Sequence, residues 1–272
     1  MKSPHLIAAV FAKPWLITPA VHGAIRQLLT AHLAGAPLAA REGENICGDK
    51  VALDSMEIIN GVARIPVSGV IGQGFSGMEK GAGATDVRDI SRELREAEAD
   101  DSVHAILFDI DSPGGMVSGT PELAEQIAYC NTPTYAFSRG TVASAAYWLA
   151  SQTSRIFATR SAELGSIGVY APFFDETAAL AAQGYQVELF TTGKYKGMGF
   201  PGTSLSDEQR AELQAGVDAI FQMFKDDVAQ GRDNISEDTM QGQTFMGATA
   251  VSAGLADEIV SDIEDVLAKL GG

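Results

Sequence analysis

The chain has 272 residues and a formal net charge of −16 at pH 7, with an isoelectric point of about 4.5. An acidic surface of this kind repels nucleic-acid phosphates and anionic lipids, so neither is expected as a partner. Hydrophobic residues make up 46% of the chain, which is ordinary for a folded protein with a core. The N-terminal apolar run, residues 6–12, is too short to span a bilayer or to form the core of a signal peptide, and we expect a cytoplasmic protein.

Hydrophobic periodicity and turn residues predict the following elements. The N-terminal part has a helix at 18–33, a linker at 34–50, strands at 56–59 and 62–71 around an Asn60-Gly61 hairpin turn, a Gly-rich loop at 72–83, and a helix at 86–99. The middle has strands at 103–110, 134–137, 155–158, 167–172 and 185–190, with helices at 121–129, 143–150 and 175–183. Helices at 205–230, 248–254 and 262–270 complete the chain. Alternating strands and helices imply βαβ units and a mainly parallel sheet.

Two organisational features follow. Residues 1–50 are expected to form an accessory segment with a peripheral helix, and residues 51–272 a single α/β domain. The helix at 205–230 should begin with a capping box, Ser206 with Gln209. Its predicted buried stripe consists of Leu213, Val217, Ile220, Phe221, Phe224 and Val228.

The two cysteines, Cys47 and Cys130, have neither metal-binding nor redox spacing. The sequence does not decide whether these two cysteines are joined by a disulfide.

Three segments carry residues suited to chemistry. Asp111-Ser112-Pro113-Gly114-Gly115 follows a buried strand, and its glycines leave backbone N–H groups accessible for an oxyanion hole. Ser144 begins a helix among small residues, where free N–H groups favour a developing oxyanion. Lys194 and Lys196 lie in a Gly-rich loop, and a lysine serves as a base when desolvation lowers its pKa. Taken singly, each segment also fits a structural role: a plain turn, an N-cap and a solvated loop.

Together these segments resemble the signal peptide peptidase A family of serine peptidases, which have the ClpP/crotonase-like fold. The matching stretches are Asp111–Gly115 (DSPGG), Ala143–Trp148 (ASAAYW), Gly165–Val169 (GSIGV) and Gly193–Gly199 (GKYKGMG). They occur in the family's order, and the resemblance covers roughly residues 60–260.

The resemblance implies a role for each matching residue. Ser144 is expected to be the nucleophile and Lys196, in preference to Lys194, the general base of a Ser–Lys dyad. Ser166 is expected to orient the lysine amine, with a plain turn hydroxyl as its alternative role. The oxyanion hole is expected to consist of Gly114, Gly115 and Ala145. No metal or cofactor is implied.

The family also suggests partners. Its members form homo-oligomers in which serine and lysine can come from neighbouring subunits. The Pro14–Pro19 segment resembles the phage branch, the minor capsid protein C or prohead protease group, whose substrates are scaffold and capsid proteins. We therefore expect a polypeptide substrate, a shared active site in a homo-oligomer, and a cytoplasmic or prohead-associated location.

Two other functions are compatible with the same fold. A crotonase-like enzyme would use the glycine turn to hold an acyl-CoA thioester, and a non-catalytic assembly protein would keep only the architecture. Ser144 together with Lys196 argues against both.

Weaker signals suggest different sites. Gly72–Gly77 fits the dinucleotide pattern G-x-G-x-x-G, but a Gly-rich loop continues after it where a helix should open. His104 could serve a Ser–His triad, although nothing in the sequence brings it to Ser144. Asp109 and Asp111 are interpreted as structural or turn-capping carboxylates.

Overall fold

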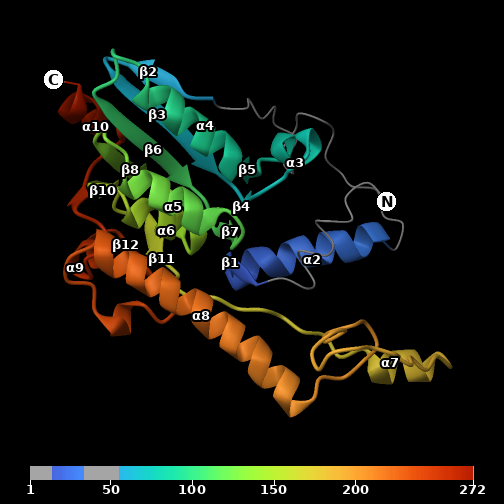
Figure 1. Ribbon diagram of the computed structural model, residues 1–272. Helices are drawn as coiled ribbons and strands as arrows, with labels where there is room; N and C mark the ends of the chain where they lie inside the picture. Colours follow the sequence, from blue (N-terminus) through green and yellow to red (C-terminus); the bar gives the residue numbers. More distant parts are fainter. Residues whose placement is uncertain (1–13, 34–54, 272) are drawn as a thin grey trace.

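The computed structural model describes residues 14–33 and 55–271 of the chain (Figure 1). The expected linker and Cys47 lie outside these residues. Within the described part, no helix combines the length and the apolar character that crossing a membrane requires.

The main sheet has six strands in the order β13-β10-β8-β6-β3-β2. All neighbouring pairs are parallel except β2 with β3. Its strands are β2 (Glu57–Ile59), β3 (Val62–Ser68), β6 (Ala105–Asp111), β8 (Thr134–Ser138), β10 (Arg155–Ala158) and β13 (Glu258–Ile259). β6 is almost entirely buried, as expected for a parallel strand covered on both faces. The predicted α/β class with a mainly parallel sheet is confirmed.

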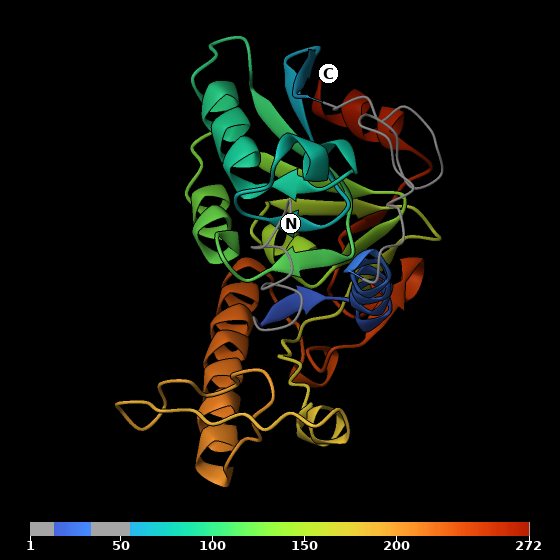
Figure 2. The same ribbon diagram turned by 90° about the vertical axis from the view of Figure 1, so that its right-hand side faces the viewer.

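Helices cover both faces of this sheet (Figures 1 and 2). The helices are α2 (Pro19–Leu33), α3 (Gly77–Gly81), α4 (Val87–Glu98), α5 (Thr120–Ala128), α6 (Ala145–Ser151), α7 (Thr177–Ala182), α8 (Asp207–Gly231), α9 (Gly247–Ser252) and α10 (Ile263–Leu270), with a 3₁₀ turn at Glu237–Thr239. Side chains of α4, α5 and α6 join the larger core cluster on one face. Side chains of α10 join the smaller cluster on the other.

Two small sheets bring the chemically interesting segments together. One has the order β1-β7-β4-β5 and the other β12-β11-β9. Their strands are β1 (Trp15–Ile17), β4 (Ile71–Gly72), β5 (Thr85–Asp86), β7 (Gly114–Met116), β9 (Thr141–Ala143), β11 (Glu163–Gly165) and β12 (Thr244–Met246). β1 is not among the strands predicted from the sequence. This strand integrates part of the N-terminal segment into the body of the protein.

Two strand predictions were wrong. Residues 167–172 form no strand and make only an isolated bridge at Tyr170. Residues 185–190 are irregular, and Tyr185 and Phe190 are 65% and 90% exposed. In the described part of the chain no strand lies beside residues 185–190, so their alternating apolar side chains have no sheet to join.

Helix α8 projects beyond the sheets. Its capping box is confirmed, because Ser206 accepts from the Gln209 backbone N–H while the Gln209 side chain accepts from the Ser206 N–H. Of the predicted buried stripe, Phe224 and Val228 are fully buried and the four residues before them only partly. The N-terminal half of α8 lies with α7 away from the sheets (Figures 1 and 2), so its apolar side chains lack a core to cover them.

Candidate active site

Ser144 lies at the junction of β9 and α6. Its backbone has φ 56° and ψ −116°, a left-handed conformation that side-chain-bearing residues avoid. The backbone is held there because the Ser144 N–H donates to the Gly165 carbonyl at 2.8 Å, and the Ser144 carbonyl accepts from the Trp148 N–H at 2.9 Å. Strain of this kind concentrates at functional sites and here fixes the hydroxyl at the start of a helix.

The glycine turn after β6 lies directly against this serine. Gly114 has φ 101°, and a Cβ placed on it would lie 3.0 Å from the Ser144 Cβ and 2.8 Å from the Ala143 carbonyl oxygen. A Cβ on Gly115 would lie 1.8 Å from the Ile71 carbonyl oxygen. Only glycine therefore allows the turn to approach the serine and β4 so closely.

Backbone N–H groups suited to an oxyanion are near Ser144. Ala145 is the first residue of α6, so its N–H has no acceptor within the helix. The Gly114 N–H donates to the Ser112 hydroxyl at 3.2 Å, near the long limit for such a bond. Ser112 in turn donates to the Gly69 carbonyl at 2.6 Å, which orients its oxygen towards the turn.

Ser166 is close to the same site. It follows β11 with φ 53° and is 7% exposed, and its N–H donates to the Gln243 carbonyl at 2.8 Å. The Ser144 hydroxyl donates to the carbonyl of Gly168, two residues beyond, at 3.5 Å. The structure thus brings Ser144, Ala145, Gly114 and Ser166 together.

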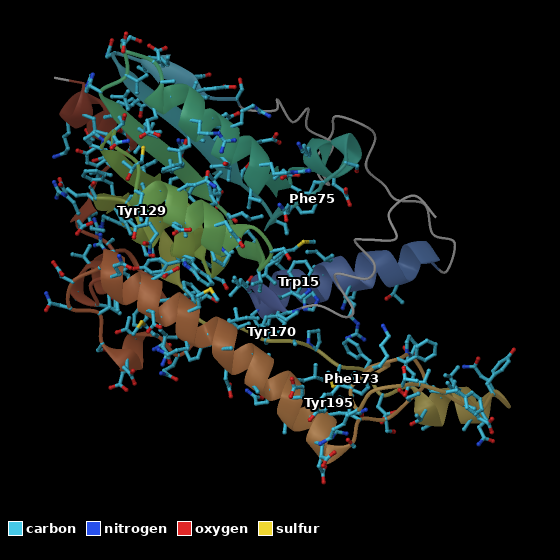
Figure 3. The ribbon with its side chains drawn as sticks, viewed as in Figure 1. Trp15, Phe75, Tyr129, Tyr170, Phe173 and Tyr195 are labelled. Carbon is cyan, nitrogen blue, oxygen red and sulfur yellow. The ribbon has the colours of Figure 1, made fainter. Side chains whose placement is uncertain are left out.

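Lys196 is not brought into this group within one chain. It lies in an exposed segment beside the N-terminal half of α8, where Figure 3 marks its neighbour Tyr195. Among the described residues, no hydrogen bond or ion pair joins Lys196 to Ser144. Lys194 forms an ion pair with Glu208 at 3.1 Å, and the hydrogen bond in this pair raises the pKa of Lys194. That contact favours the charged amine and makes Lys194 the poorer base.

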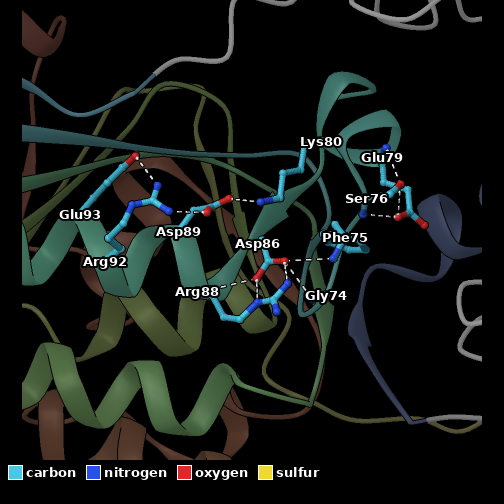
Figure 4. A network of polar contacts seen from close by, with 10 residues as sticks. All are labelled: Gly74, Phe75, Ser76, Glu79, Lys80, Asp86, Arg88, Asp89, Arg92 and Glu93. Carbon is cyan, nitrogen blue, oxygen red and sulfur yellow. Dashed lines mark hydrogen bonds and ion pairs between the residues drawn. The ribbon is translucent and has the colours of Figure 1, made fainter.

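The Gly72–Gly77 loop does not form a phosphate cradle. Its Gly74 and Phe75 N–H groups donate to the buried carboxylate of Asp86 at 2.9 and 3.0 Å (Figure 4). Arg88 donates to the same carboxylate from its backbone N–H at 3.0 Å. A carboxylate of the protein itself therefore occupies the donors that a phosphate would need.

The remaining candidate residues have structural contacts. His104 Nε2 is 2.9 Å from the Leu270 carbonyl oxygen of α10. Asp109 accepts from Arg64 Nε at 3.0 Å, and Asp111 accepts from the Thr141 N–H at 2.9 Å. The interpretation of the two carboxylates as structural is confirmed.

Strand β1, which was not predicted from the sequence, crosses the site. Leu16 is paired with Gly115 and Ile17 with Gly114, antiparallel to β7. A Cβ on Gly114 would lie 2.1 Å from the Leu16 carbonyl oxygen, so this oxygen lies at the glycine turn. A three-residue apolar run gives no periodicity, and no signal in the sequence would have placed it there.

Comparison with known proteins agrees with the motifs. The family model described as Peptidase family S49 matches residues 129–271, and the one described as Clp protease matches residues 79–164. A head-tail preconnector protein GP5 from Enterobacteria phage P21 is 32% identical, over 97% of this chain and 57% of that protein. A capsid assembly protease C from Escherichia phage lambda is 31% identical, over 97% of this chain and 64% of that protein.

The chain thus spans less than two thirds of the length of either relative. Among solved structures, a ClpP1 mutant from Listeria monocytogenes is 15% identical, over 74% of this chain and 92% of that one, with a TM-score of 0.49.

The family model of S49 covers more than half of the chain, including Ser144, Ser166 and Lys196. The chain therefore belongs to peptidase family S49, as its four sequence motifs indicated.

Proposed function

We propose that the chain is a serine endopeptidase in which Ser144 is the nucleophile and Lys196 the general base. The observation that carries this proposal is the strained backbone of Ser144, φ 56°, held at the start of α6 against the Gly114 turn. Nothing in the packing of an ordinary N-cap requires that conformation, whereas a nucleophile must be held at a fixed place beside its oxyanion donors.

The reaction proceeds through an acyl-enzyme. The neutral amine of Lys196 removes the Ser144 hydroxyl proton as the oxygen attacks a peptide carbonyl. The N–H groups of Ala145 and of the Gly114–Gly115 turn stabilise the oxyanion. The lysine then gives its proton to the leaving amine, and it activates the water that hydrolyses the ester. Ser166, whose backbone lies beside the Ser144 loop, positions the amine.

We propose that Lys196 acts on the Ser144 of a neighbouring subunit. An amine that serves as a base must be desolvated, and the Lys196 side chain is exposed in the single chain. The segment that carries it also exposes Phe190 and Phe200, which are 90% and 47% accessible. Apolar side chains exposed beside the half-covered face of α8 favour burial against another copy of the chain.

The substrates we propose are phage capsid or scaffold proteins, with the enzyme associated with the prohead. This follows from the relatives, one of which is named as a capsid assembly protease. The net charge of −16 fits a protein substrate better than a nucleic acid.

The test is cleavage of phage scaffold and capsid proteins. Wild-type protein should produce new peptide termini detected by mass spectrometry, and Ser144→Ala should lower their rate of formation by about a thousandfold or more. Circular dichroism and thermal unfolding should show that the variant keeps its fold. Cleavage at the wild-type rate by Ser144→Ala would remove the proposal.

A further inference from the structure

We infer that β1 occupies the channel in which the polypeptide substrate binds, so that residues 15–17 act as a built-in plug with a substrate-like conformation. The inference rests on the proposed peptidase function and adds to it a regulated state and a class of substrate segment. It depends on where β1 lies relative to the two chain segments that flank Ser144.

The first flank is β7. This strand carries the Gly114–Gly115 turn, and β1 is the edge strand beside it in the order β1-β7-β4-β5. Without β1, the outer edge of β7 would expose unpaired N–H and C=O groups next to the nucleophile. Such an edge binds an extended peptide by adding it to the sheet as a strand.

The second flank is the segment after Ser166. Trp15 and Tyr170 exchange both backbone hydrogen bonds, at 2.8 and 3.2 Å. The chain between Ser166 and Tyr170 includes Gly168, whose carbonyl accepts from the Ser144 hydroxyl. The strand β1 therefore lies between two segments that both contact the nucleophile, and it is antiparallel to each.

The backbone of β1 also places a peptide carbonyl at the glycine turn, on the side that faces Ser144. The Leu16 carbonyl oxygen is the atom nearest to a Cβ placed on Gly114, at 2.1 Å, and the Ser144 Cβ lies 3.0 Å from the same point. A peptide substrate must bring a carbonyl to this turn before the serine can attack. While β1 is in place, no second chain can do so.

β1 lies outside the residues that the two family models match, which are 79–271. The helix that follows, α2, is partly exposed, and nothing lies within 4 Å of a Cβ added at Gly23. The plug is held by its backbone pairing with β7 and Tyr170 and by its own three side chains, which are 0–2% exposed. The His22 ring lies against the rings of Trp15 and Tyr170, both of which are labelled in Figure 3.

The side chains of β1 indicate the class of segment that the channel accepts. Trp15 and Ile17 face a cluster with Phe75 and Met116, while Leu16 faces the main core on the opposite side. An extended segment with consecutive apolar residues satisfies both sides of the channel. Substrates that replace β1 should therefore be cleaved beside such apolar segments.

A reversible crosslink tests the plug. Trp15 is opposite Met116. The Thr18 N–H donates to the Pro113 carbonyl in the same register, so Thr18 and Pro113 form a hydrogen-bonded pair. Because hydrogen-bonded and non-hydrogen-bonded pairs alternate along an antiparallel ladder, the Trp15–Met116 pair, three residues away, is a non-hydrogen-bonded one. The Cα atoms of such a pair are near enough for a disulfide. The variant combines Trp15→Cys and Met116→Cys in a background with Cys47→Ser and Cys130→Ser. Cleavage of fluorescein-labelled casein is measured before and after reduction with dithiothreitol.

The oxidised protein should cleave about tenfold more slowly or worse, with full recovery on reduction, because a locked β1 cannot leave. The casein cleavage rate of each single-cysteine variant should be the same before and after reduction. Trp15→Cys should be at least as active as the background. Equal activity in both redox states, or loss of activity in Trp15→Cys, would overturn the inference and leave the peptidase proposal standing.

Binding separates the two proposals. With Ser144→Ala added, the crosslinked protein should bind labelled casein only after reduction, as measured by fluorescence anisotropy. This result supports the plug even if no variant cleaves casein, in which case the peptidase proposal fails alone. Equal binding in both redox states overturns the plug.

Discussion

The Cα of Gly114 faces the side chain of Ser144 so closely that a methyl group on the glycine would lie 3.0 Å from the serine Cβ and 2.1 Å from the Leu16 carbonyl oxygen. The approach joins three segments that are far apart in sequence. It depends on a residue without a Cβ and with φ 101°. Any side chain at position 114 should therefore disturb both the turn and its approach to Ser144.

Gly114→Ala should destabilise the protein by about 2 kcal/mol or more, because of a strained backbone and a clash with two backbone oxygens. Cleavage should also fall, since the turn must move away from Ser144. Urea unfolding measures the first effect and casein hydrolysis the second. The matched control is Gly216→Ala in α8, where nothing lies within 4 Å and the change should be neutral or stabilising. Equal effects at both positions would contradict this account.

The strain at Ser144 predicts an unusual order of stability among its variants. Glycine tolerates φ 56° and alanine does not, so Ser144→Gly should be more stable than Ser144→Ala by about 1 kcal/mol. Both should be inactive. In the same helix, Ser151 is buried with ordinary helical geometry, and there the alanine variant should be the more stable. Thermal unfolding of the four variants shows whether the order of stability of the glycine and alanine variants is reversed between positions 144 and 151. The same order at both positions would refute backbone strain at Ser144.

The proposed sharing of the active site between subunits predicts complementation. Ser144→Ala and Lys196→Ala should each be inactive alone. Mixed together under conditions that exchange subunits, they should recover about a quarter of wild-type activity, since random mixing leaves one interface in four with both groups. Native mass spectrometry confirms that mixed oligomers form. Mixed oligomers without activity would mean that serine and lysine act within one chain.

The buried carboxylate of Asp86 predicts a pH-dependent contribution to stability. Burial raises its pKa, but hydrogen bonds from Arg88, Phe75 and Gly74 outweigh this and lower it to about 2 from 3.8. A depressed pKa stabilises the fold above the unfolded-state value, and this contribution is lost as the pH falls from about 4 through 2.

Asp86→Asn should therefore cost about 2 kcal/mol at pH 7, and less as the pH approaches 2. Urea unfolding at several pH values measures the difference from wild type. Asp101→Asn, at an exposed position, should change stability by less than about 0.5 kcal/mol throughout. A cost for Asp86→Asn that does not vary with pH would contradict the assigned hydrogen bonds.

The parts of the fold that the sequence predicted are those with local causes. The Asn60-Gly61 turn has φ 49° and 76°, the left-handed pair that this dipeptide favours. The α8 capping box and the buried strand β6 likewise depend on neighbouring residues. The short strands β1 and β7 depend instead on pairing across about a hundred residues, which no local pattern encodes.

The wrong predictions also have a physical reason. The alternation at residues 185–190 and the apolar stripe along α8 are both real, but apart from Phe224 and Val228 the single chain leaves these side chains partly or fully exposed. Periodicity indicates that a surface is suited to burial and does not say which chain will cover it. Likewise, the motifs identified Ser144 and Lys196 as candidates, although only Ser144 is joined to the glycine turn within one chain.

The central claim is that Ser144 is the nucleophile and is activated by Lys196. The direct measurement is reaction with a fluorophosphonate probe, followed by peptide mass spectrometry to identify the modified residue and the rate of labelling. The account predicts one adduct, on Ser144, forming about a hundredfold more slowly in Lys196→Ala. An adduct on another serine, or labelling of Ser144 in Lys196→Ala at the wild-type rate, would contradict it.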